Sequence, residues 1–149
     1  MKKLLLFVAS IVVFASCTST HSLYNWGAPV NGDNFTRYDE LSYNSYDKQS
    51  PQSICELLCF YEYMITNPGG VRNIVPPGIC AEYGYLLLKP ETAGMFLQYA
   101  TAKQKKVFGG MDDYSTLFHE KGIQMMEREM ELYPESVTFL TPILNQMRH

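Results

Sequence analysis

Apolar residues recur at helical spacing in successive segments between residue 50 and the C-terminus, and this pattern constrains the fold more than any other feature. The first segment opens at Ser50-Pro51, where serine is a favoured N-cap and proline suits the first helical position. It ends at Asn67-Pro68-Gly69-Gly70. Its apolar stripe consists of Ile54, Leu57, Leu58, Tyr61, Met64 and Ile65. Because each stripe has to be covered by another, the repeated pattern predicts an all-α fold, a small helical bundle.

Further helices are expected after this first one, separated by proline and glycine. They should cover residues 79–88, 91–106 and 114–133, followed by a short helix after Pro134 with Phe139, Leu140, Ile143 and Leu144 packing back. Asp112 or Asp113 is the expected cap of the long helix. A glycine inside a helix costs about 1 kcal/mol relative to alanine. Gly84 therefore indicates that another backbone approaches closely, and Gly122 lies on the inward side of the long helix.

Residues 18 to 49 show neither the helical nor the strand period and contain many turn-forming residues. We expect residues 17–49 to form a tether with an irregular aromatic segment, and residues 50–149 to form the helical domain. The irregular segment should lie over the helices without forming one. Tyr24, Trp26 and Gly27 are candidate partner contacts, because Tyr and Trp offer large contact areas at small entropic cost. Whether Trp26 contacts a partner or plugs the bundle stays open.

Residues 1–16 have the pattern of a secretory signal peptide. Two lysines precede an apolar run that is too short to cross a bilayer, which takes about 20 residues. The run closes on Ala15-Ser16-Cys17, which resembles the site where lipoprotein signals are cut after the thiol has been lipidated. We therefore expect Cys17 to be the lipid-bearing first residue of the mature chain, anchored in a membrane by several acyl chains. Thr18, which is not aspartate, is consistent with passage to the outer membrane.

The charge balance argues against nucleic acid as a partner. Removal of Lys2 and Lys3 with the signal leaves 10 of the 12 basic residues against 15 acidic ones. Nucleic-acid-binding proteins instead present basic patches.

Three cysteines remain after Cys17, in a compartment that is generally oxidising. Cys55, Cys59 and Cys80 are more readily explained as buried free thiols that act as small apolar residues. A disulfide from Cys80 to one of the other two stays open, whereas a metal site is not expected because no histidine has ligand spacing.

Three sequence blocks follow Cys17 in order: Leu23-Tyr24-Asn25-Trp26-Gly27; Val75-Pro76-Pro77-Gly78 with Ala81-Glu82-Tyr83-Gly84-Tyr85-Leu86-Leu87; and Glu131-Leu132-Tyr133-Pro134-Glu135-Ser136 followed by Phe139. Together they resemble a family of small bacterial outer-membrane lipoproteins of unknown function. That family is similar to tetratricopeptide-type helical hairpins, and its genes commonly sit beside a lipoprotein resembling the curli secretion channel. The resemblance implies that Gly84, Gly122 and Pro134 occupy the small and closing positions of one degenerate hairpin.

The resulting functional hypothesis is a lipid-anchored, non-catalytic adaptor or stabiliser of an envelope assembly. The resemblance implies other envelope lipoproteins as partners and a position facing the periplasm. No cofactor and no catalytic residues are expected, because no nucleophile and base, paired acids or phosphate loop stand in a recognisable pattern. The alternatives are a peptide or small-ligand binder, using a groove between the second and the long helix, and a thiol-redox protein.

Overall fold

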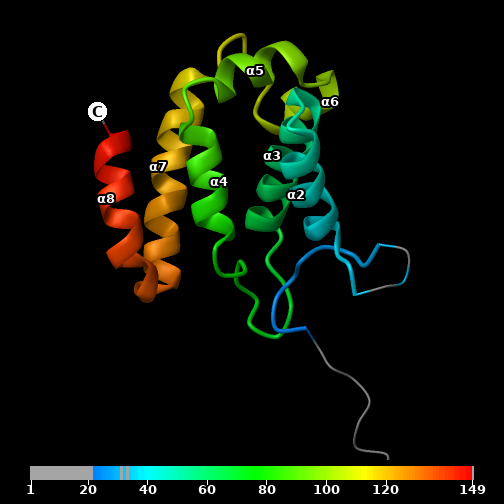
Figure 1. Cartoon of the computed structure of the whole chain (residues 1–149), viewed down its shortest axis with the longest axis vertical. Helices are drawn as coiled ribbons and strands as arrows, with labels where there is room; N and C mark the ends of the chain where they lie inside the picture. Colours follow the sequence, from blue (N-terminus) through cyan, green and yellow to red (C-terminus); the bar gives the residue numbers. More distant parts are fainter. Residues whose placement is uncertain (1–21, 31, 33, 149) are drawn as a thin grey trace, which may run out of the picture.

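The computed structural model describes residues 22–30, 32 and 34–148 and builds them almost entirely from helices (Figure 1). The α-helices are α2 (Arg37–Lys48), α3 (Pro51–Thr66), α4 (Ile79–Leu88), α5 (Thr92–Tyr99), α6 (Ala102–Val107), α7 (Ser115–Leu132) and α8 (Val137–Met147), with a 3-10 turn η1 (Pro134–Ser136) between the last two. These described residues contain no β-strand, so the predicted all-α fold is confirmed. The expected signal peptide and Cys17 lie outside them.

The helices α8, α7, α4 and α3 stand side by side, with α2 against α3, while α5 and α6 cross one end (Figure 1). Aromatic rings fill the core beneath that end, where the Phe96 ring meets Phe108, Tyr114 and Phe118 edge to face at centroid separations of 5.0 to 5.3 Å. Such rings contribute large buried areas and favour this geometry. None of the described helices has the length and apolar character needed to cross a membrane.

The contact between α4 and α7 depends on two glycines. A Cβ placed on Gly84 would lie 2.7 Å from the backbone oxygen of Gly122, and one on Gly122 would lie 2.5 Å from Cγ of Leu88. Both distances are shorter than side chains tolerate. Glycine at these positions lets the two backbones touch, which outweighs its poor helix propensity.

The start of α4 is capped by a side chain from α7. Gly78, the N-cap, has φ of +88° and no side chain with which to cap the helix. The buried carboxylate of Glu129 accepts hydrogen bonds from the backbone N–H groups of Gly78 at 2.7 Å and Ala81 at 3.4 Å. These are among the N–H groups that a helix leaves unpaired at its N-terminus, and a negative charge is favoured there.

A second connection joins three helices through Glu62 of α3. Its carboxylate accepts a hydrogen bond from the hydroxyl of Tyr83 in α4 at 2.7 Å and pairs with Lys121 of α7, also at 2.7 Å. Tyr83 is completely buried, so its hydroxyl needs such a partner. The network therefore fixes α3, α4 and α7 relative to one another.

The prediction that residues 18 to 49 are irregular is wrong over α2. Thr36 and Asp39 form a capping box that starts this helix, and both reciprocal hydrogen bonds are present. Only Leu41 of α2 is buried, so the helix has no broad apolar stripe that could reveal it in the sequence.

The single helix expected over residues 91–106 is also wrong, because the chain breaks at Ala100 and Thr101 into α5 and α6. Thr101 and Gln104 form a second capping box, which begins α6. The expected cap of the long helix is wrong as well, because the N-cap of α7 is Tyr114, whose side chain makes no capping hydrogen bond. The carboxylate of Asp113, one residue earlier, accepts from the backbone N–H and the hydroxyl of Ser115, at 2.9 and 2.8 Å.

The expected packing of α8 is only partly realised. Leu144 is buried, but Phe139 is 74% exposed and Ile143 is exposed as well. Helix α8 lies at the edge of the molecule against α7 (Figure 1), so its outer side has no helix to cover it among the described residues. Pro134 opens η1, the turn that sends α8 back along α7.

Candidate functional site

The aromatic segment, residues 22–27, is bound along one side by the loop that follows α3. The backbone N–H groups of Val71 and Arg72 donate to the carbonyls of Ser22 and Leu23, both at 3.0 Å. Gly70 makes this approach possible, since its φ is +72° and a Cβ there would lie 2.6 Å from the Leu23 backbone. Helix α3 already ends at Thr66, with Asn67 as its C-cap, so the Gly69-Gly70 pair in the following loop serves to receive the aromatic segment.

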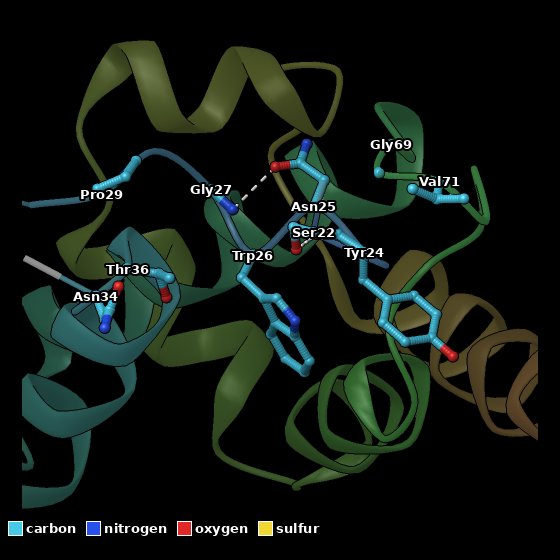
Figure 2. Close-up of a pocket in the computed structure, with 11 residues that line it drawn as sticks. Ser22, Tyr24, Asn25, Trp26, Gly27, Pro29, Asn34, Thr36, Gly69 and Val71 are labelled. Atoms are coloured by element: carbon cyan, nitrogen blue, oxygen red, sulfur yellow. Dashed lines mark hydrogen bonds between the residues drawn. The ribbon is translucent and has the colours of Figure 1, made fainter. Parts of the chain in front are cut away.

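The other end of the aromatic segment turns at Gly27, where it contacts α3 and the start of α2. Gly27 has φ of +85°, and a Cβ there would lie 2.7 Å from the Phe60 ring of α3. Its N–H donates to the side-chain oxygen of Asn25 at 3.0 Å (Figure 2). The N–H of Tyr38 donates to the Trp26 carbonyl at 3.3 Å. The turn at Gly27 therefore requires glycine for both its backbone angle and its close contact.

The rings of Tyr24 and Trp26 lie over the helices. Trp26 is half-buried and packs against the core, with its ring centroid 5.3 Å from that of Tyr38 and 6.5 Å from that of Tyr24. The Tyr24 hydroxyl accepts a hydrogen bond from the Arg72 guanidinium at 2.6 Å, which lowers the pKa of Tyr24. The sequence left open whether Trp26 contacts a partner or plugs the bundle. This packing favours the second role, in which Trp26 holds the aromatic segment to the helices.

An open hollow of about 630 Å³ lies beside the aromatic segment (Figure 2). We call it the N-terminal hollow; its lining residues are Ser22, Tyr24, Asn25, Trp26, Gly27, Pro29, Asn34, Thr36, Gly69, Gly70 and Val71. Two apolar side chains on the segments that are hydrogen-bonded to each other here are exposed, Leu23 at 58% and Val71 at 65%. Aromatic, apolar and polar side chains thus line the hollow, and Leu23 adds a further exposed apolar side chain nearby, a composition suited to contact with another molecule.

The three described cysteines are unbonded thiols. Cys55 and Cys80 are fully buried, and Cys59 is half-buried. Burial raises the pKa of Cys55 to about 11 and the pKa values of Cys59 and Cys80 to about 12. The thiols are therefore protonated near neutral pH, which disfavours nucleophilic or redox chemistry. Among the described residues, no three His, Cys, Asp or Glu side chains converge in a way that could hold a metal ion.

We expect these thiols to be almost inert in the folded protein. At pH 7.5, labelling of the native protein with a chromogenic disulfide reagent should be slower by on the order of a hundredfold or more than labelling in urea, because so little thiolate is present. The time course of absorbance, in native buffer and in urea, measures both rates. A single thiol that reacts natively at the unfolded rate would revive the thiol-redox hypothesis.

The groove that the ligand-binding hypothesis places between the second and the long helix is filled where Gly84 meets Gly122. That filling counts against a ligand site between α4 and α7. The structure brings Tyr24, Trp26 and Gly27 together in one docked segment, whereas Gly84 and Gly122 lie in the α4–α7 contact.

Sequence reasoning missed the residues that receive the aromatic segment. Arg72, Phe60 and Gly70 contact it from positions 30 or more residues away, and nothing in their own neighbourhoods marks them. The glycine pair had a sufficient local explanation as a helix terminator. Comparison with protein-family models, curated proteins and solved structures finds no match for this chain.

Proposed function

We propose that this protein is a lipid-anchored, non-catalytic adaptor that holds partner lipoproteins in an outer-membrane assembly, facing the periplasm. Its membrane attachment is the lipid on Cys17. The family resemblance favours a partner similar to the curli secretion channel. The observation that carries the proposal is the docking of the aromatic segment onto the bundle, five residues after Cys17.

The short stretch of chain between Cys17 and Ser22 limits how far the N-terminal hollow can lie from the membrane. An extended chain spans at most about 3.6 Å per residue, so Ser22 lies within roughly 18 Å of a lipidated Cys17. Because backbone hydrogen bonds hold Ser22 and Leu23 to the loop after α3, the bundle itself has to stay near the bilayer. A partner that engages the N-terminal hollow would therefore be a membrane-bound neighbour, which supports an adaptor within an assembly of lipoproteins.

The side chains exposed at the N-terminal hollow are better suited to contact with a partner than to catalysis. Trp26 and Gly27 are engaged with the helices, so the exposed Leu23 and Val71 provide the free apolar area. The raised pKa values of the buried thiols add to the case for a non-catalytic role.

Photo-crosslinking in intact cells tests this proposal. A photoreactive amino acid in place of Leu23 should capture one discrete envelope lipoprotein, identified by mass spectrometry. The same group in place of Met111 should not capture it, because this exposed residue belongs to the segment between α6 and α7, and that segment lies at the opposite end of the bundle (Figure 1). Combining the Leu23 probe with Cys17→Ala should abolish the crosslink while the helices stay folded.

Two results would contradict the proposal. A Leu23 crosslink that survives Cys17→Ala would show that the tether is incidental. Equal capture from Leu23 and Met111 would show that the N-terminal hollow is not the contact surface.

A further inference from the structure

A second cavity, of about 420 Å³, opens between α2, α3 and α4 and plays no part in the proposed adaptor function. We call it the α2–α4 cavity; its lining residues are Ser45, Tyr46, Gln49, Ile54, Leu57, Tyr61, Glu82, Tyr85, Leu86 and Lys89. Its size falls in the range of small-ligand sites, which combine an apolar surface with a few convergent polar groups.

Two opposite charges stand on the same side of α4 at the edge of this cavity. Glu82 and Lys89 are seven residues apart, which is close to two helical turns and about 10 Å along the axis. Neither forms a salt bridge with any described residue. They also form no salt bridge with each other, so both charges stay available to a ligand.

The carboxylate of Glu82 is held in place from the cavity wall. Its Oε2 accepts hydrogen bonds from the hydroxyls of Tyr38 at 2.8 Å and Tyr61 at 2.7 Å. Tyr61 is buried, and its burial raises its pKa, so its hydroxyl keeps the proton that it donates. The other oxygen, Oε1, accepts no hydrogen bond from the described residues. Glu82 is thus an oriented carboxylate with one oxygen free to accept from a cation.

The surface between the two charges is apolar and aromatic. Ile54, Leu57 and Leu86 contribute aliphatic area, and the Lys89 ammonium lies 5.3 Å from the centroid of the Tyr85 ring. This contact holds the ammonium over the ring. The cavity thus combines an oriented carboxylate, an apolar surface and an ammonium group.

We propose that the α2–α4 cavity binds a short peptide of about three residues with free termini. Its ammonium would contact Glu82, its carboxylate would contact Lys89, and its middle side chain would lie on the aliphatic surface. An extended peptide advances 3.3 to 3.4 Å per residue, so three residues span the roughly 10 Å of axial rise between Glu82 and Lys89. A single amino acid spans about a third of that rise.

Calorimetric titration of the full-length protein with the tripeptide Ala-Leu-Ala tests the site. The free tripeptide should bind saturably at one site, and blocking either terminus, by acetylation or amidation, should weaken binding about tenfold, which corresponds to 1.4 kcal/mol. Lys89→Gln should weaken binding of the free tripeptide by the same factor but leave the affinity for the amidated tripeptide unchanged. Glu82→Gln should likewise weaken binding of the free tripeptide but leave the affinity for the acetylated tripeptide unchanged.

Glu91→Gln and Lys106→Gln are matched controls, because both residues are exposed and lie outside the cavity lining. They should leave every affinity unchanged. Since Glu82→Gln also replaces the carboxylate that accepts from two tyrosines with an amide, the Lys89→Gln and amidation pair provides a test that does not depend on it. Absence of saturable binding, equal affinity for the blocked peptides, or alanine binding as tightly as the tripeptide would each overturn the proposal.

Discussion

Gly84→Ala is expected to destabilise the protein by at least about 2 kcal/mol, although alanine is the better helix former by about 1 kcal/mol. The added methyl group would lie 2.7 Å from the backbone oxygen of Gly122 and about 3 Å from Met126 of α7. A backbone atom cannot rotate away as a side chain does, so α4 and α7 would have to separate. This pair of helices forms the largest contact between elements of the fold, and separation would expose buried residues on both.

Urea unfolding followed by far-ultraviolet circular dichroism measures this effect, and the chain contains a matched control. Gly94 lies in α5, is exposed, and has nothing within 4 Å of its would-be Cβ. Gly94→Ala should therefore stabilise the protein by about 0.5 to 1 kcal/mol through helix propensity alone. Gly122→Ala should fall between the two, because its nearest obstacle is the side chain of Leu88. Equal effects of Gly84→Ala and Gly94→Ala would refute the close contact.

Glu129→Ala is expected to destabilise the protein by about 2 to 3 kcal/mol, since it leaves half-buried backbone N–H groups at the start of α4 without an acceptor and empties the site of a buried side chain. Glu129 is 3% exposed, and Gly78 offers no cap of its own. Glu129→Gln retains an acceptor oxygen and should cost only about 1 kcal/mol. Glu131→Ala, at an exposed position of the same helix, should have almost no effect.

The pH dependence of Glu129→Gln provides an independent test. Burial raises the pKa of Glu129 above its ordinary value of 4.5, and the N–H groups of Gly78 and Ala81 only partly oppose this. A raised folded-state pKa means that the folded protein binds the proton more tightly than the unfolded chain. The contribution to stability is therefore present below pH 4.5 and is lost as the pH rises through the folded-state pKa.

The free energy of unfolding of the native protein, relative to that of Glu129→Gln, should consequently fall as the pH rises above 4.5. Urea unfolding of both proteins between pH 4 and pH 8 would reveal this change in the difference. A difference that grows with pH would mean that the N–H groups outweigh burial and that the pKa of Glu129 is lowered instead.

The starts of α2 and α6 were not predicted from the apolar pattern, although a local signal in the sequence marks both. Thr36 with Asp39 and Thr101 with Gln104 both have the spacing of a capping box and begin α2 and α6. Helix α2 was missed because its periodic apolar residues are almost absent. The break at Ala100 was missed because apolar residues on both sides fit one longer helix.

The sequence by itself determined the helices α3, α4 and α7 and the proline and glycine residues that separate them from their neighbours. Their stripes, caps and breakers act within a few residues, so they can be recognised without knowing the partners. The all-α class followed from the same local features. The spacing of Gly84 also indicated a close approach, although not the identity of the backbone that approaches.

Only the tertiary structure decided which distant groups meet. It places Glu129 at the N-terminus of α4, Gly70 and Arg72 beside the aromatic segment, and Glu82 against Tyr61 in the α2–α4 cavity. It also leaves Phe139 exposed, because α8 lies at the edge of the bundle. These outcomes depend on how the helices pack, and packing is set by complementary shapes and satisfied polar groups across the whole chain, which no local pattern contains.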